Sequence, residues 1–220
     1  MARKQAFANG EFFHIYNQGV DKRIVFADNG DMQRFFQSIV EFNTVTPVGS
    51  LYQNTFRKLS GPTPKSEEKL VNIIAYCLNP NHFHLILEQL VDGGISEFMK
   101  RLSGGYTCFF NHKNGRNGSL FQGKFKAAHI DSNEYLLHVS AYVNLNDKVH
   151  QLSGRTAKLV QSKSSWREYT NVCAGGICEK RIVLEQFKNI CEYEEFALSS
   201  LETMRERKQD LKDLDKIFLE

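Results

Sequence analysis

The sequence predicts an α+β fold, a ferredoxin-like split βαβ antiparallel sheet with helices on one face. Strand-like alternation, two neighbouring apolar runs and helical apolar spacing together give the order β-α-β-β-α-β-α over about residues 11–146. The rest of the chain indicates a mostly helical C-terminal extension. We therefore expect one domain at residues 10–147 and an extension at residues 148–220.

The strands are predicted from alternation and from one probable hairpin. Residues 11–18 place successive side chains on opposite faces, as a half-buried strand does. Residues 70–78 form a continuous apolar run with β-branched members, which indicates a buried strand. Asn79-Pro80-Asn81 then interrupts the run, and residues 82–90 resume it, so we expect a hairpin. Residues 120–130 are also strand-like.

Helices are predicted from apolar spacing and capping residues. Residues 31–42 show helical spacing, and a second helix should run over residues 96–112 from an N-cap at Ser96. Ser132 should cap a third helix, whose apolar stripe includes Tyr135 and Tyr142. Residues 201–220 carry 11 charges of mixed sign, which indicates a solvated helix or a frayed tail.

Composition excludes several classes of protein. The 220 residues are 41% hydrophobic and 24% charged, which is ample for a core and unlike a disordered chain. No apolar run approaches the roughly 18 residues that span a bilayer, so we expect neither membrane attachment nor a secretory signal. Five cysteines, an odd number, favour the reducing cytoplasm over a disulfide framework.

The net charge of +3 hides an uneven distribution. Residues 98–130 contain six basic residues and no acidic one, whereas the rest of the chain has 22 basic and 25 acidic residues. Cations that hold phosphates and aromatic rings that stack on bases are what a single-strand groove needs. The alternative is an ordinary solvated face. The candidate DNA-binding residues are Lys100, Arg101, Lys113, Arg116, Phe121, Gln122, Lys124 and Lys126.

Two histidines on one strand are the strongest chemical signal. Side chains at positions i and i+2 of a strand share a face, so His82 and His84 should project together. Two neutral imidazoles at this spacing can chelate a divalent cation and leave positions open for a substrate. The alternative is a pair of surface or core histidines.

A second signal lies near the end of the third predicted helix. Tyr142 and Asn146 are four residues apart, so they should share a helical face one turn apart. A phenol beside an amide oxygen suits a nucleophile beside a third metal ligand. The alternative is that Tyr142 belongs to the apolar stripe and Asn146 caps the helix.

Taken with their surroundings, these residues resemble the single-tyrosine HUH transposases, and in particular the REP-associated tyrosine transposases. Five stretches of sequence carry the resemblance, and they occur in the order expected for that family. They are His14-Ile15-Tyr16-Asn17-Gln18-Gly19, Ala75 to His84 with the block Pro80-Asn81-His82-Phe83-His84, Gly105-Tyr106, Leu120-Phe121-Gln122-Gly123-Lys124-Phe125-Lys126, and Tyr142 to Asn146.

The resemblance implies a metal-dependent transposase. His82, His84 and Asn146 would bind Mg²⁺ or Mn²⁺, and Tyr142 would be the nucleophile. The reaction would nick and transfer single-stranded, hairpin-bearing DNA with palindromic ends through a 5′-phosphotyrosine intermediate. The protein would work on nucleoid DNA, as a monomer or as a homodimer. His138 and His14 are auxiliary candidates near the site.

Two departures from the family pattern affect the site. Asn146 is followed by Asp147, where proline is usual, so either residue is a candidate third ligand. Asn79 stands where an apolar residue is common, and we expect it to lie away from the chemistry.

Two other functions fit the same motifs. One is a non-catalytic binder of single-stranded nucleic acid on the same fold. The other is a replication-initiator or relaxase-like nickase, which would share the chemistry but recognise different DNA.

Overall fold

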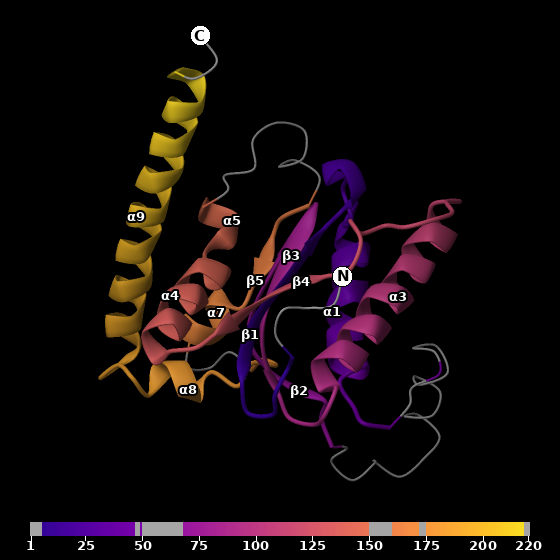
Figure 1. The fold of residues 1–220 in the computed structure, drawn as a ribbon, viewed down its shortest axis with the longest axis horizontal. Coiled ribbons are helices and arrows are strands. Elements are labelled where there is room, and N and C mark those ends of the chain that lie inside the picture. Colours follow the sequence, from indigo (N-terminus) through magenta and orange to yellow (C-terminus); the bar gives the residue numbers. More distant parts are fainter. Residues whose placement is uncertain (1–5, 47–48, 50–67, 150–159, 172–174, 218–220) are drawn as a thin grey trace.

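The computed structural model describes residues 6–46, 49, 68–149, 160–171 and 175–217, and its centre is an antiparallel sheet (Figure 1). The strands lie in the order β4-β1-β3-β2-β5. Their bounds are β1 Phe12–Gln18, β2 Val71–Asn79, β3 His82–Gln89, β4 Lys126–Ile130 and β5 Lys163–Ser164. The first four strands of this order form the split βαβ arrangement. The predicted α+β class and antiparallel sheet are confirmed.

The helices cover both faces of the sheet, which corrects the expectation of helices on one face (Figure 1). The two crossover helices, α1 (Asn29–Glu41) and α3 (Gly94–Lys113), pack on one face as expected. On the other face lie α4 Asn133–Asn144, α5 Asn146–Val149, α7 Trp166–Thr170, α8 Arg181–Leu184 and α9 Ile190–Ile217. The predicted helical extension is confirmed.

The apolar content of the central strands explains the second layer. In β2 and β3 nearly every side chain is buried, so both faces need a cover. Leu78, Phe83 and Leu85 pack toward α1 and α3. Ile74, Cys77 and Ile86 pack with residues of α4 and α9. A purely one-sided layer of helices would leave this second set in water.

Element ends follow local capping chemistry, with two corrections. Ser132 caps α4 as predicted, because its side chain accepts a hydrogen bond from the Tyr135 amide. The second helix begins at Gly94 rather than after Ser96, because Gly93 turns the chain in the left-handed region at φ 69°. Tyr135 is 41% exposed, so it does not belong to the buried stripe. The last predicted strand is shorter and begins at Lys126.

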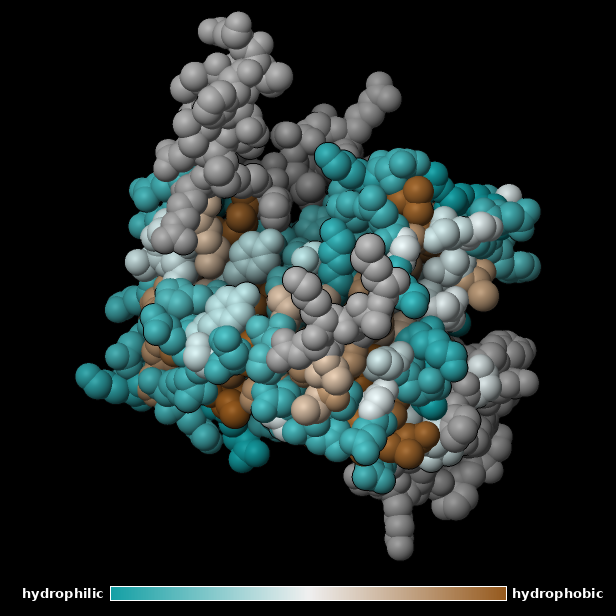
Figure 2. Space-filling model, in the orientation of Figure 1, coloured by the Kyte–Doolittle hydropathy of each residue, from teal (hydrophilic) through white to brown (hydrophobic). Residues whose placement is uncertain are grey.

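The predicted boundary between residues 147 and 148 stays a prediction, since residues 150–159 lie outside the described residues. Residues 201–217 continue α9, so the charged C-terminal segment is helical there. Within the described part of the chain, none of the helices combines the length and the apolar character that crossing a membrane requires. The face in Figure 2 is mainly hydrophilic, with hydrophobic residues in small separate patches.

Two adjacent glycines in α3 provide a test of its packing. A Cβ on Gly105 would lie 2.9 Å from the Phe42 ring, whereas a Cβ on Gly104 would meet nothing within 4 Å. We expect Gly105→Ala to lower the free energy of unfolding by about 1–2 kcal/mol through overpacking. Gly104→Ala should raise it by roughly 0.5–1 kcal/mol through helix propensity. Urea unfolding followed by circular dichroism measures both, and effects of the same sign would contradict this packing.

Candidate active site

The β2–β3 hairpin places the two histidines on the face that α4 covers. Asn79 pairs with His82 across the hairpin, and Tyr16 of β1 pairs with His84. The turn is fixed from outside, because the Pro80 carbonyl accepts hydrogen bonds from the backbone amides of residues 25 and 26, at 2.8 and 3.0 Å. Strand alternation puts both histidines on one face, and the anchored turn holds the end of β3 that carries them.

The contacts of the His82 ring favour one tautomer of its neutral form. Its Nδ1 lies 2.6 Å from Asn81 Oδ1, which only accepts, so the proton of the neutral ring is on Nδ1. The lone pair of the neutral ring is then on Nε2. That nitrogen lies 3.1 Å from Asn146 Oδ1, a second acceptor. Two acceptors at this separation suit a shared cation.

His84 is supported by His14, one of the auxiliary candidates. His14 Nε2 and His84 Nδ1 are 2.9 Å apart, and their rings stack with centroids 5.1 Å apart. Burial lowers the pKa of His14 to about 4, so its ring is neutral at pH 7. A neutral His14 can accept from His84 Nδ1–H, which leaves the His84 lone pair on Nε2.

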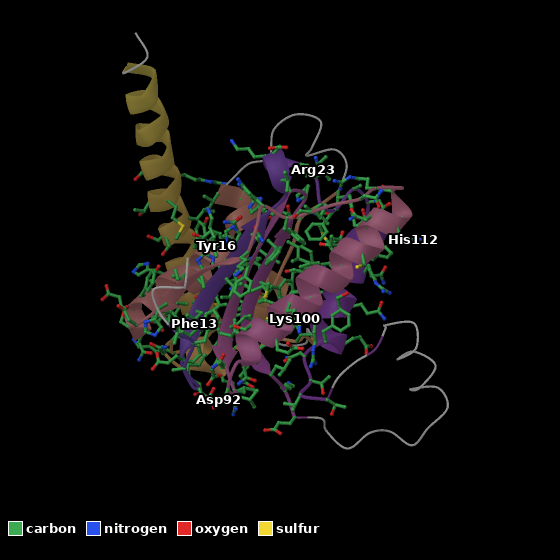
Figure 3. All side chains as sticks on the ribbon, turned by 45° about the vertical axis from the view of Figure 1, so that its right-hand side comes forward. Phe13, Tyr16, Arg23, Asp92, Lys100 and His112 are labelled. Carbon is green, nitrogen blue, oxygen red and sulfur yellow. The ribbon has the colours of Figure 1, made fainter. Side chains whose placement is uncertain are left out.

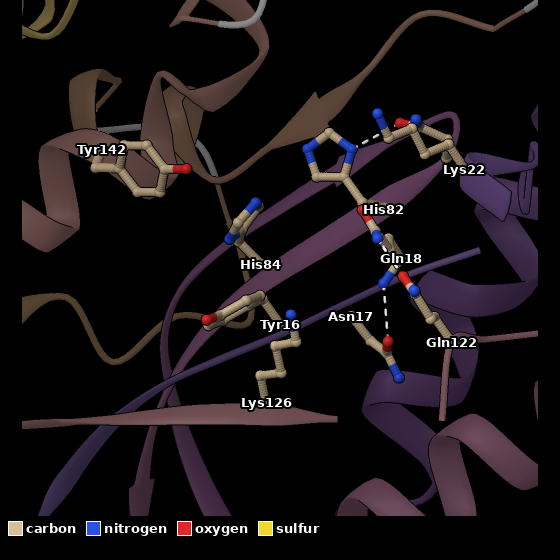
Figure 4. Close-up of a pocket in the computed structure, with 10 residues that line it drawn as sticks. Tyr16, Asn17, Gln18, Lys22, His82, His84, Gln122, Lys126 and Tyr142 are labelled. Carbon is tan, nitrogen blue, oxygen red and sulfur yellow. Dashed lines mark hydrogen bonds between the residues drawn. The ribbon is translucent and has the colours of Figure 1, made fainter. Parts of the chain in front are cut away.

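Tyr142 comes to the same place from α4 of the same chain. Its ring centroid is 5.5 Å from that of His84 and 5.9 Å from that of His14. Figure 4 shows its hydroxyl pointing toward the histidines. Burial raises the pKa of the Tyr142 phenol, while the nearby amide of Asn146 acts to lower it. In this structure, Tyr142 therefore lies beside His84 and His14 of its own chain.

The helix that carries Tyr142 is interrupted before Asn146, whereas we expected the two residues on one continuous helix. Tyr142 and Asn146 do not share one continuous helix, because α4 ends at Asn144 and α5 begins at Asn146. Leu145 lies between them, and its amide still bonds to the Ala141 carbonyl at 3.0 Å. The fully buried Asn146 side chain lies beside both Tyr142 and His82.

The alternative third ligand and the second auxiliary candidate lie elsewhere. Asp147 lines a separate cavity of about 940 Å³, beside Tyr76 and Trp166. Burial raises the pKa of its carboxyl group. His138 is exposed and packs on Phe196 of α9, with ring centroids 5.1 Å apart. The structure therefore brings neither residue to the histidines.

A cavity of about 430 Å³ opens beside the histidines and Tyr142. Besides them, it is lined by Tyr16, Asn17, Gln18, Lys22, Asn81, Gln122 and Lys126. Lys22 was not foreseen, and it holds a left-handed backbone at φ 56°, which is costly for a residue other than glycine. Such strain is typical of functional sites. No local sequence pattern signals this position.

In the fold, acidic side chains from outside residues 98–130 pair with several basic residues of this block and offset part of its positive charge. Lys100 and Arg101 pair with Glu97, just outside the block. Lys113 pairs with Asp28, the N-cap of α1, and with Asp31 in its first turn, at 2.6 Å each.

Other members of the block also lie away from the cavity. Arg116 lies over the Phe110 ring, and Phe121 is 4% exposed, so its ring is part of the core rather than a stacking surface. Figure 3 shows Lys100 on α3, apart from Tyr16 on β1. Of the predicted DNA-binding residues, Gln122 and Lys126 line the cavity, and Lys124 is exposed between them in sequence.

One known protein family matches the part of the chain that carries most of the sequence motifs. Residues 62–146 match the protein family described as "Transposase IS200 like". This chain is similar to the IS200-like transposases. The matched range contains His82, His84, Tyr142 and Asn146. No curated protein matches the chain significantly.

One solved structure with a similar fold is described as "Structure of the REP associates tyrosine transposase bound to a REP hairpin". It is 16% identical, and the match covers 81% of this chain and 93% of that one with a TM-score of 0.48. At this distance, residue roles do not transfer from it.

A polar network fixes the end of α4 that carries Tyr142. The buried Asn144 donates from Nδ2 to the Tyr193 hydroxyl of α9 at 2.8 Å and accepts from Ser165 Oγ at 2.5 Å. The C-terminal extension therefore supports the tyrosine-bearing helix.

Removing one hydroxyl tests this support. Tyr193→Phe leaves the buried Asn144 amide without its acceptor, so we expect the free energy of unfolding to fall by about 1–3 kcal/mol. Tyr135→Phe is the control, because it removes the hydroxyl of an exposed tyrosine on α4, the helix that ends at Asn144. It should change the free energy of unfolding by less than about 0.5 kcal/mol. Chemical denaturation measures both, and equal effects would argue against the network.

Proposed function

We propose that the protein is a single-tyrosine DNA nuclease and strand transferase that acts on single-stranded, hairpin-bearing DNA. The observation that carries the proposal is that Tyr142, His82 and His84 line one cavity of one chain, with the buried Asn146 side chain in contact with His82. The similarity of residues 62–146 to IS200-like transposases supports it independently. DNA transposition is the process that such a reaction serves.

The donor set fits a divalent cation. His82 Nε2 and Asn146 Oδ1 are 3.1 Å apart, close to the edge of about 3 Å between neighbouring ligands of an octahedral Mg²⁺ or Mn²⁺. Among the described residues, no group of three His, Cys, Asp or Glu side chains could hold a metal, so amide oxygens must complete the set. His82, His84 and Asn146 would hold the cation. When bound, it would act as a Lewis acid toward a DNA phosphate.

Tyr142 would supply the nucleophilic oxygen. Its phenol attacks the scissile phosphorus while the P–O3′ bond breaks, which gives a 5′-phosphotyrosine and a strand ending in a 3′-OH. The phenol loses a proton and the leaving 3′ oxygen gains one. Because burial raises the pKa of Tyr142, the hydroxyl is a poor nucleophile until it is activated. Attack by a second 3′-OH on the phosphotyrosine would reverse these bond changes and join strands.

The remaining side chains of the cavity suit a nucleic-acid backbone. Lys22 and Lys126 provide two cations, and Asn17 and Gln122 provide amide groups. Lys126 Nζ also lies 5.9 Å from the centre of the Tyr16 ring. Because Tyr142 lines the same cavity, a backbone phosphate held by these side chains would share that cavity with the nucleophile.

A covalent-adduct assay tests the chemistry. We expect full-length protein with Mn²⁺ to form an adduct, stable to denaturing gels, with labelled single-stranded oligonucleotides from the DNA that flanks its gene. Tyr142→Phe and EDTA should each abolish it. Tyr16→Phe is the matched control, since it removes the other hydroxyl of the cavity and should keep the adduct.

Two results would contradict the proposal. An adduct that survives in Tyr142→Phe would assign the nucleophile elsewhere. Tight binding without any adduct, insensitive to EDTA and to His82→Ala with His84→Ala, would favour a non-catalytic binder.

The salt dependence of DNA binding tests the lysines at the cavity. We expect Lys124→Gln with Lys126→Gln to flatten the slope of log K against log[salt] by about 0.7 for each phosphate of a single strand that the lysines neutralise. Lys69→Gln with Lys188→Gln removes the same charge from exposed positions outside the cavity and should keep the slope. Fluorescence anisotropy at several salt concentrations measures it. Equal slopes in both double variants would exclude Lys124 and Lys126 as phosphate-binding residues.

A further inference from the structure

Asn79, which we expected to lie away from the chemistry, is in the centre of the site. Its side chain is fully buried at the end of β2. Asn79 Nδ2 lies 2.8 Å from Asn146 Oδ1 and 3.0 Å from His82 Nε2, and those two atoms are 3.1 Å apart. Three polar atoms from three parts of the chain thus form a nearly equilateral triangle.

Two corners of the triangle are acceptors and one is a donor. In the neutral ring, His82 Nε2 carries the lone pair because Nδ1–H donates to Asn81 Oδ1, and Asn146 Oδ1 is an amide oxygen. The two hydrogens of the planar Asn79 amide diverge, so one nitrogen serves two acceptors 3.1 Å apart poorly. The amide nitrogen of Asn79 is therefore a weak match for this corner.

The amide oxygen of Asn79, unlike its nitrogen, would suit this corner when a cation is bound. Turning the amide over would put Oδ1 where Nδ2 lies and complete a triangle of three acceptors. Its edges of 2.8 to 3.1 Å match one face of an octahedron with ligands at about 2.0–2.1 Å. Ser162 Oγ now donates to Asn79 Oδ1 at 2.8 Å, and a hydroxyl can equally accept from the amide nitrogen. Ser162 therefore supports both orientations.

We propose that Asn79 is a further oxygen ligand of the divalent cation, on the same octahedral face as His82 and Asn146. This inference rests on the proposed function, because it concerns the same metal. Ser162, in the C-terminal extension, would then hydrogen-bond a metal ligand and help to orient it. The site then draws on β2, β3, the start of α5 and the segment before β5.

Mn²⁺ binding to the full-length protein without DNA tests the proposal, with free Mn²⁺ measured by electron paramagnetic resonance. Asn79→Leu removes the oxygen, and we expect Mn²⁺ affinity to fall by about tenfold or more. Asn79→Asp supplies a charged oxygen and no N–H, and should bind Mn²⁺ at least as tightly as the natural sequence. Asn72→Leu, the same change at the far end of β2, should leave the affinity unchanged. The rise in melting temperature on adding Mn²⁺ gives a second measurement.

The outcomes separate the inference from the proposed function. If Asn79→Asp binds Mn²⁺ as weakly as Asn79→Leu, the N–H is what matters, and Asn79 positions its neighbours instead of binding the metal. If Asn79→Leu binds as tightly as the natural sequence, Asn79 has no part in the site. Both results overturn the inference and leave the metal site standing. If the natural protein binds Mn²⁺ no better than His82→Ala with His84→Ala, the metal of the proposed function fails as well.

Discussion

The burial of β2 and β3 on both faces determines the rest of the architecture. A two-layer fold would cover only the face on which α1 and α3 pack, and would leave Ile74, Cys77 and Ile86 exposed. At about 25 cal/mol per Å² of apolar surface, leaving three such side chains in water would cost several kcal/mol. Helix α4 and the C-terminal helices are therefore needed for stability before any chemistry is considered.

The site lies where this second apolar layer ends. Along β3, Ile86 belongs to the apolar face, and His84 and His82 follow it on the same face toward the hairpin. Helix α4 seals the apolar part and carries Tyr142 over the polar part. The requirement for a second layer thus explains how the tyrosine and the histidines meet within one chain.

Sequence periodicity identified which residues share a face of an element, but not which other elements or side chains contact that face. The i, i+2 spacing correctly placed His82 and His84 on one face, because a regular strand allows nothing else. It gave no information on which helix covers that face. Nor does the sequence show which basic residues have acidic partners, since Lys113 meets Asp28 and Asp31 across 85 and 82 positions. Asn79 and Lys22 also acquire their surroundings only through the tertiary fold.

The candidate ligands also constrain how metal and DNA bind. His82, His84, Asn146 and Asn79 are all neutral when they offer lone pairs, and among the described residues no carboxylate lines the cavity onto which the two histidines open. A divalent cation held only by neutral groups keeps its full charge in a partly buried site, so a nearby anion would strengthen its binding. In the proposed function, a DNA phosphate would be that anion. If the cation binds as proposed, each partner raises the affinity of the other by the same factor, as linkage requires. The uncharged ligand set then makes the metal site depend on the substrate it serves.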